Sequence, residues 1–214
     1  MCSGREALTS LMPEAEFDRQ LSTLISLGYP ALADLTEDAF RATVGPLRPV
    51  ALEAAAPYVL VISPALVAAE RAVPLLTLAG ATRPGVVDRN FAEGDLARFT
   101  PQPHLGVPDE PAYLVLDVER GEEFGNVKPD DAVATIAARG RTPLTIAEGI
   151  ALVTHHPELL VKNKCFSLAG SRCGDRRVPA LWISQGAPKL GWCFAGVPHT
   201  WLGCASAGAR RSGA

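Results

Sequence analysis

The chain has 214 residues, the size of one ordinary globular domain. Hydrophobic residues make up 48% and charged residues 20%, a composition that excludes disordered, collagen-like and coiled-coil proteins. No apolar run approaches the roughly 18 residues that cross a bilayer. The start, Met1–Glu6, lacks the basic and apolar regions of a secretory signal. We therefore expect a soluble cytoplasmic protein that forms a single domain, residues 1–214, and binds no membrane.

The formal net charge of −3 is unevenly distributed along the chain. Residues 163–214 contain seven cations and one acid, a net charge of +6, whereas residues 1–162 contain 22 acids and 13 cations, a net charge of −9. The positive segment can attract a small anionic ligand, or it can dock on the acidic remainder of the same chain. Because the basic residues form no stripe with interleaved aromatic residues, nucleic-acid binding is not expected.

The N-terminal third predicts helices. Apolar residues follow the helical period over residues 17–27, between a starting proline at Pro13 and a terminating glycine at Gly28. A second short helix is expected over residues 36–45, with two acids in its first turn and an apolar side formed by Phe40 and Val44.

The middle of the chain predicts short strands and one short helix. Tyr58–Ile62 is rich in β-formers and predicts a buried strand, and the following serine and proline predict a cap and first turn for a helix over residues 65–71. Residues 73–78 could form a strand or continue the helix, and their proline favours an edge strand. Residues 85–90 predict another short strand. The proline-rich residues 100–111 predict an extended surface connection.

Two further helices are expected beyond a strand over residues 113–118. One starts at Pro129 and ends at a glycine, and the other begins with the capping box of Thr145 and Glu148. The second must end near His156, because the next residue is proline. Adjacent histidines on a helix point about 100° apart, so we interpret His155 and His156 as a helix-end cap rather than as two ligands of one metal.

From Cys165 onward, apolar residues recur at every second position, which is the period of a β-strand. Strands are expected over residues 165–168, 178–184, 189–194 and 200–205, separated by glycine and proline turns. The simplest arrangement is an antiparallel meander, a cysteine- and tryptophan-rich subregion of residues 163–206. The predicted fold class is α+β, with N-terminal helices and short strands packed against a C-terminal antiparallel sheet.

The C-terminal third also carries a resemblance. The segment 162–184 (KNKCFSLAGSRCGDRRVPALWIS), residues 191–193 (GWC) and residues 198–203 (PHTWLG) resemble a bacterial protein family of unknown function. Residues 143–152 (PLTIAEGIAL) look like part of the same pattern, and the resemblance covers most of the chain. It implies no activity and no catalytic residue.

Cysteines are the sharpest chemical signal. Four of them lie within 40 residues of sequence, beside all three tryptophans, and cytosolic disulfides are disfavoured. A zinc ion could be held by Cys165, Cys173, Cys193 and His199, although no C-x-x-C pair is present. The alternatives are buried apolar thiols, to which Cys204 would also belong, or a reactive thiol.

A nucleophilic pair of Cys193 and His199 is the candidate catalytic machinery, since a thiolate needs a neighbouring base or cation near neutral pH. On the predicted strand Cys193 shares a face with Gly191 and Ala195. These small residues either leave a pocket beside the sulfur or allow close packing.

An anion-binding loop is the candidate ligand site. Residues 170–177 combine glycines, a hydroxyl and three arginines between two strands, which suits a phosphate or carboxylate. The proposed ligand-binding residues are Ser171, Arg172, Arg176, Trp192 and Trp201. The alternative is a hairpin in which an aspartate pairs locally with an arginine and the other arginines are solvated.

These observations name no substrate. The favoured interpretation is a non-catalytic or ligand-binding domain whose site lies on the C-terminal sheet and takes an anionic ligand. The alternatives are an enzyme that uses the Cys193–His199 pair, a zinc-stabilised domain, and a homo-oligomer whose interface uses the tryptophan-rich sheet.

Overall fold

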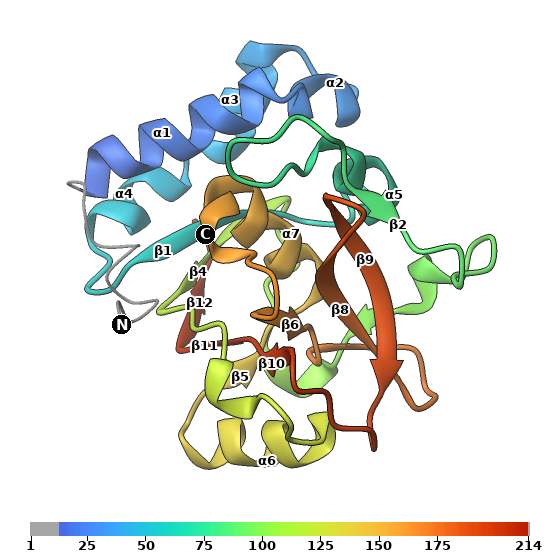
Figure 1. Cartoon of the computed structure of the whole chain (residues 1–214). Coiled ribbons are helices and arrows are strands. Elements are labelled where there is room, and N and C mark those ends of the chain that lie inside the picture. Colours follow the sequence, from blue (N-terminus) through green and yellow to red (C-terminus); the bar gives the residue numbers. More distant parts are fainter. Residues whose placement is uncertain (1–12, 214) are drawn as a thin grey trace.

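The computed structural model describes residues 13–213 and has the predicted α+β architecture (Figure 1). Met1–Glu6, including Cys2, lies outside the described residues. The α-helices are α1 (Pro13–Ser26), α2 (Tyr29–Leu32), α3 (Glu37–Val44), α4 (Leu47–Leu52), α5 (Ala69–Ala72), α6 (Pro129–Ala138) and α7 (Ile146–His155). The 3-10 helices are η2 (Val73–Leu75), η3 (Leu96–Arg98), η4 (Pro103–Leu105), η5 (Glu122–Phe124) and η6 (Pro157–Leu159). Across residues 13–213, every helix is too short or too polar to cross a bilayer.

Twelve strands are present in this part of the chain. They are β1 (Tyr58–Ile62), β2 (Val86–Val87), β3 (Thr100–Pro101), β4 (Ala112–Leu116), β5 (Thr142–Pro143), β6 (Cys165–Ser167), β7 (Ser171–Arg172), β8 (Arg177–Ser184), β9 (Ala187–Phe194), β10 (Leu202–Cys204), β11 (Ser206–Ala207) and β12 (Ala209–Arg211). The two larger sheets have the strand orders β1-β4-β12 and β10-β6-β8-β9-β2. Two short pairs, β11-β5 and β3-β7, complete the set.

The N-terminal helices confirm the two predicted from periodicity. Helix α1 buries Phe17 and its apolar neighbours on one face, and Thr36 caps α3 by accepting a hydrogen bond from the backbone N–H of Ala39. Gly28, with φ of 85°, turns the chain from α1 into α2. Helices α2 and α4 were not predicted, because at four and six residues they are too short to show a period.

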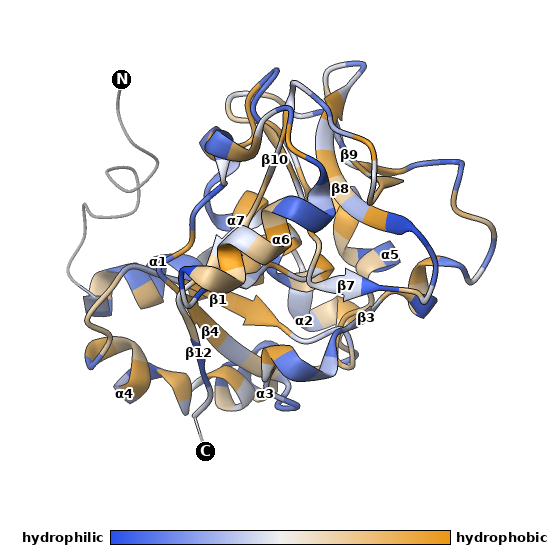
Figure 2. Ribbon diagram, turned by 90° about the horizontal axis from the view of Figure 1, so that it is seen from below, coloured by the Kyte–Doolittle hydropathy of each residue, from blue (hydrophilic) through white to orange (hydrophobic). Residues whose placement is uncertain are grey.

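Strand β1 is buried along its whole length, as predicted, and Figure 2 shows its hydrophobic colouring. It pairs antiparallel with β4, and β12 pairs with the other edge of β4. The free edge of β1 is covered by the buried side chain of Gln20, whose Oε1 accepts a hydrogen bond from Leu60 N–H (2.7 Å) and whose Nε2 donates to Tyr58 O (3.0 Å). Gln20 therefore supplies two of the hydrogen bonds that a further strand would supply.

The predicted meander of the C-terminal strands is wrong in its last step. Strands β6, β8 and β9 are antiparallel neighbours, but β10 pairs parallel to β6 at the opposite edge of the sheet. Residues 195–201 between β9 and β10 are too many for a tight hairpin and carry the chain across. Part of the outer edge of β9 is already occupied by β2.

Helix α7 lies at the centre of the molecule, between β1 and the β8–β9 ribbon (Figure 1). Its capping box is present as predicted: Thr145 Oγ1 accepts from Glu148 N–H (3.3 Å), and Glu148 Oε2 accepts from Thr145 N–H (2.8 Å). Most of its side chains are buried because it is covered from several sides. This helix places the candidate site described below.

Two predictions between residues 65 and 78 are wrong. The helix expected over residues 65–71 is reduced to α5, and the strand expected over residues 73–78 is replaced by η2. Pro74 is the physical reason for the second error, since its fixed φ also suits the first turn of a helix. The predicted serine cap is present, because Ser63 Oγ accepts a hydrogen bond from Ala65 N–H (3.3 Å).

The positive C-terminal segment docks on the acidic remainder of the chain, which was one of the two alternatives. Five of its cations pair with acids from residues 88–148. These pairs are Lys164–Glu122 (3.0 Å), Arg172–Asp130 (3.6 Å), Arg177–Asp95, Lys189–Asp88 (3.2 Å) and Arg210–Glu148 (2.5 Å). The charge asymmetry is therefore largely neutralised within the fold.

Candidate functional site

The described residues form a cleft of about 660 Å³. It lies between residues 63–70, which follow β1, residues 96–109, and the start of α7 at residues 145–147. Tyr113 from β4 and Ser171 from β7 complete the lining. Its volume is within the range of about 300–1,000 Å³ that is usual for small-molecule sites.

Besides the exposed Thr100, four hydroxyl-bearing side chains from different segments line this cleft: Ser63, Tyr113, Thr145 and Ser171. All four are buried. Around them the lining is mainly alanine, proline and other apolar residues, including Leu96, and the exposed acids Glu70 and Asp109 also contribute to it. The arrangement is a mainly hydrocarbon cleft with a few fixed polar groups, which is typical of ligand pockets.

The first turn of α7 is held in place by these hydroxyls. Ile146 N–H donates to Ser171 Oγ (3.0 Å), which joins α7 to β7. The Tyr113 hydroxyl donates to Glu148 Oε1 (3.3 Å), and burial, followed by the charge of Glu148, raises the pKa of Tyr113. The phenol is therefore protonated at neutral pH and serves as a hydrogen-bond donor, not as a base.

A buried ion pair supports the cleft from behind. Arg210 contacts Glu148 through Nε–Oε1 (2.5 Å) and Nη2–Oε2 (2.9 Å), and the two side chains are 4% and 0% exposed. The same guanidinium donates to Leu105 O (3.3 Å), Thr142 Oγ1 (2.6 Å) and Pro143 O (3.2 Å). Arg210 thus connects β12, α7, β5 and the 96–109 wall of the cleft.

Arg177 fixes the other end of that wall. Its Nη2 donates to Asp95 Oδ1 (3.0 Å) and its Nε donates to Asp175 Oδ2 (2.8 Å). The guanidinium carbon lies 5.2 Å from the ring centre of Phe99 and 5.6 Å from that of Trp192. Because Phe99 lines the cleft, the contacts of Arg177 help to set the position of the wall.

Of the ligand-binding residues predicted from the anion loop, Ser171 lines the cleft. Arg172 pairs with Asp130, and Arg176 is exposed. Trp192 packs against Arg177. Trp201 packs edge-on against Trp182, with 6.1 Å between the ring centres. Local pairing of Asp175 with Arg177 matches the hairpin alternative for this loop.

The predicted catalytic pair is not joined by a hydrogen bond among the described residues. Burial, followed by the nearby Cys204, raises the pKa of Cys193 to about 11, which disfavours the thiolate. His199 instead packs against Trp201, with 5.4 Å between the ring centres. The space expected beside the sulfur is filled, since a Cβ on Gly191 would meet the Trp182 ring at 2.0 Å. Close packing is thus the observed alternative.

The four predicted zinc ligands, Cys165, Cys173, Cys193 and His199, do not form a metal-binding group. No set of three or more His, Cys, Asp or Glu side chains within residues 13–213 is arranged to hold a metal ion. The thiol of Cys165 instead donates to Val161 O (3.6 Å), and that of Cys173 donates to Asp175 Oδ1 (3.2 Å). All four cysteines of this part of the chain are free thiols.

The two histidines at the end of α7 are buried, contrary to the interpretation as a charged cap. His155 Nε2 lies 3.0 Å from Leu60 O, so it is the donor in that contact. Burial lowers the pKa of His155 to about 3, and burial followed by the charge of Arg19 lowers the pKa of His156. Both rings are therefore neutral at pH 7, and the expected charge–dipole attraction is absent.

The sequence interpretation missed most of the cleft. The sequence predicts Ser63 and Thr145 as caps, and in the structure both residues also line the cavity. The proline-rich residues 100–111 predict a surface connection, and in the structure residues 100–103 and 107–109 form part of a wall of the cleft. The available signal was the serine directly after a fully buried strand, together with a capping box, because both features place hydroxyls at the ends of elements.

A family model described as a family of unknown function, DUF5701, matches residues 23–213. No curated protein and no solved structure matches the chain. The family match extends over all of the elements that build the cleft.

Proposed function

The chain belongs to the DUF5701 family, and we propose that it is a binding domain for a small organic molecule, which occupies the cleft beside the first turn of α7. The observation that carries this proposal is the convergence of four buried hydroxyl groups, from Ser63, Tyr113, Thr145 and Ser171, on one mainly apolar cavity of about 660 Å³.

Binding is favoured over catalysis by the chemistry of the lining. It contains serine and threonine hydroxyls but no histidine, cysteine, lysine or arginine. A serine hydroxyl is a weak nucleophile without a neighbouring base, and the pKa of Tyr113 is raised, which leaves it protonated. The cleft therefore offers hydrogen bonds and apolar surface without an activated nucleophile.

A neutral or positively charged ligand fits this lining better than the anion expected from the C-terminal arginines. The charged residues of the lining are Glu70 and Asp109, both exposed. The N–H groups of Thr145, Ile146 and Glu148 at the start of α7 already donate to protein oxygens. An anion would therefore meet negative charge without a matching cation.

We also propose that the protein acts in the cytoplasm. Support comes from the four free thiols in the described residues, since a reducing compartment keeps thiols unpaired.

Titration with three six-carbon probes, 1-hexanol, hexylamine and hexanoate, tests the proposal by NMR. We expect 1-hexanol and hexylamine to shift the backbone amides of Ser63, Ala147 and Ser171, and hexanoate to bind more weakly. Shifts confined to other regions, or tightest binding of hexanoate, would contradict the proposal.

A matched pair of serine variants provides the control. Ser171→Ala removes a hydroxyl from the cleft and should weaken 1-hexanol binding by about 1 kcal/mol, or roughly fivefold in Kd. Ser167→Ala removes an equally buried hydroxyl, bonded to Gly203 O, that lies outside the cleft. It should leave the Kd unchanged.

A further inference from the structure

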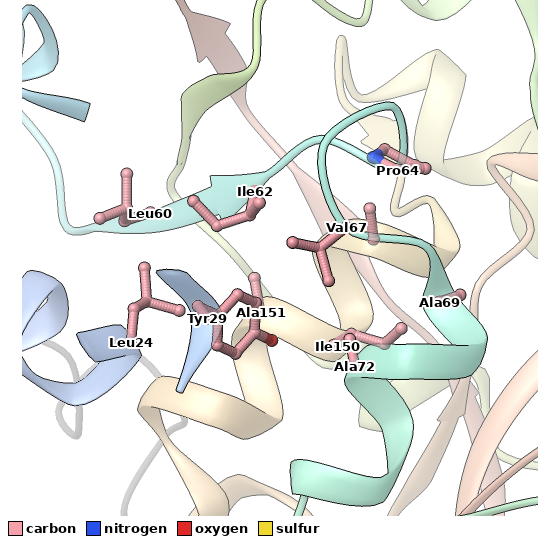
Figure 3. A pocket seen from close by; sticks show the side chains of 11 residues that line it. Leu24, Tyr29, Leu60, Ile62, Pro64, Val67, Ala69, Ala72, Ile150 and Ala151 are labelled. Atoms are coloured by element: carbon pink, nitrogen blue, oxygen red, sulfur yellow. The ribbon is translucent and has the colours of Figure 1, made fainter. Parts of the chain in front are cut away.

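A second, smaller void, shown in Figure 3, adjoins the cleft. Its volume is about 20 Å³, enough for one small group such as a methyl. In Figure 3 Tyr29 from α2, Ile62 from β1, Val67 and the α7 residues Ile150 and Ala151 surround this space. Every lining side chain other than Tyr29 is a hydrocarbon.

The void and the cleft share a boundary. Pro64, Ala69 and Ala147 belong to the lining of both cavities. All three side chains are small, and Ala69 and Ala147 are half-buried. The two spaces therefore adjoin one another at these methyl and ring carbons. A larger side chain at either alanine would reduce the space between them.

We propose that the void is the inner end of the same ligand site and that it receives the terminal alkyl group of an amphiphilic ligand. This inference rests on the proposed function and specifies the class of ligand: a hydroxyl- or amine-bearing molecule with an unbranched alkyl tail. The polar group stays with the hydroxyls of Thr145 and Ser171, and the tail passes Ala69 and Ala147. The hydrocarbon lining of the void favours an alkyl group.

Ala151 and Val67 then determine the length of tail that the site accepts. Both are buried, and both line the void but not the cleft. Each methylene that enters an apolar site strengthens binding about fourfold, until the space is filled. Reducing the void should shorten the chain length at which this gain ends, and enlarging it should extend that length.

The experiment titrates the full chain with the straight-chain primary alcohols from 1-butanol to 1-octanol and follows the Ser171 amide by NMR. The wild-type Kd should fall about fourfold per methylene and then level off. Ala151→Val should move the levelling point to a shorter alcohol, and Val67→Ala to a longer one. Ala97→Val, which changes the outer cleft alone, should leave it in place. Because the two void variants act in opposite directions, a loss of stability in one does not reproduce the pattern.

The outcomes separate this inference from the proposed function. If no alcohol shifts the Ser171 amide, the proposed function fails. If the alcohols bind and Ser171→Ala weakens them, but the levelling point is the same in Ala151→Val, Val67→Ala and the wild type, the cleft binds ligands and the inference about the void is overturned.

Discussion

Arg210 and Glu148, separated by 62 residues in sequence, form a two-point ion pair that is almost completely removed from solvent. Glu148 also closes the capping box of α7 and accepts a hydrogen bond from Tyr113. One carboxylate therefore connects the start of the central helix, a central strand and the C-terminal strand β12, directly behind the candidate site.

Removal of this cation should destabilise the fold strongly. We expect Arg210→Met to lower the free energy of unfolding by about 3–5 kcal/mol, because the Glu148 carboxylate would remain buried without its partner. Urea denaturation followed by circular dichroism measures this change. Arg211→Met, at the exposed neighbouring position, is the control and should cost less than about 0.5 kcal/mol. The double variant Arg210→Met with Glu148→Gln should lose less than Arg210→Met alone, and a larger loss would contradict the explanation.

Acid should weaken the fold through His155. Its pKa is about 3 in the folded protein, against about 6.5 when unfolded, so below pH 6.5 the unfolded state binds the extra proton. Stability is therefore lost as the pH falls from 6.5 towards 3, by up to about 1.4 kcal/mol per pH unit. Urea denaturation at pH 7.0, 6.0 and 5.0 measures the slope.

His155→Gln provides the test of that assignment. The glutamine amide retains a donor for Leu60 O but does not titrate. The variant should have a shallower pH dependence below pH 6.5, whereas His104→Gln, at an exposed position, should keep the wild-type slope. An unchanged slope in His155→Gln would assign the acid sensitivity to other groups, of which His156 is the nearest in sequence.

Arg177→Lys should loosen the wall of the cleft. Lysine retains the positive charge but loses the planar fork that bonds both Asp95 and Asp175 and stacks on Phe99. We expect a loss of about 1–3 kcal/mol in local stability, seen as faster hydrogen exchange of the Phe99 amide, which is bonded to Leu96 O. The matched control is Arg176→Lys at the exposed neighbouring position, and equal effects of the two variants would show that Arg177 has no special role.

Cys193 should react slowly with thiol reagents in the native protein. With a pKa of about 11, only about one part in 10⁴ is thiolate at pH 7. Iodoacetamide labelling followed by mass spectrometry should modify the partly exposed Cys173 first, and Cys193 only after denaturation. Rapid native labelling of Cys193 would restore the interpretation of this thiol as a nucleophile.

Local signals in the sequence were enough to predict several elements. Thr36, Thr145 and Glu148 cap helices because their side chains reach backbone groups within three residues, so neighbours in sequence determine the contact. The buried strand Tyr58–Ile62 was recognised from its β-branched and apolar residues. The same local logic failed at Pro74, whose restricted φ fits either an edge strand or a helical turn.

Only the tertiary structure decided the position of the candidate site. The cleft is lined by side chains from four separate segments, and their convergence depends on the strand order and on the position of α7 in the fold. These side chains are Ser63, Tyr113, Thr145 and Ser171. The parallel pairing of β10 with β6 and the burial of His155 against Leu60 depend in the same way on contacts between distant residues. Composition, capping and hydrophobic period act over a few residues, and they determined α1, α3, α6, α7 and the fold class. The cleft arises from contacts across the whole chain, which no local pattern encodes.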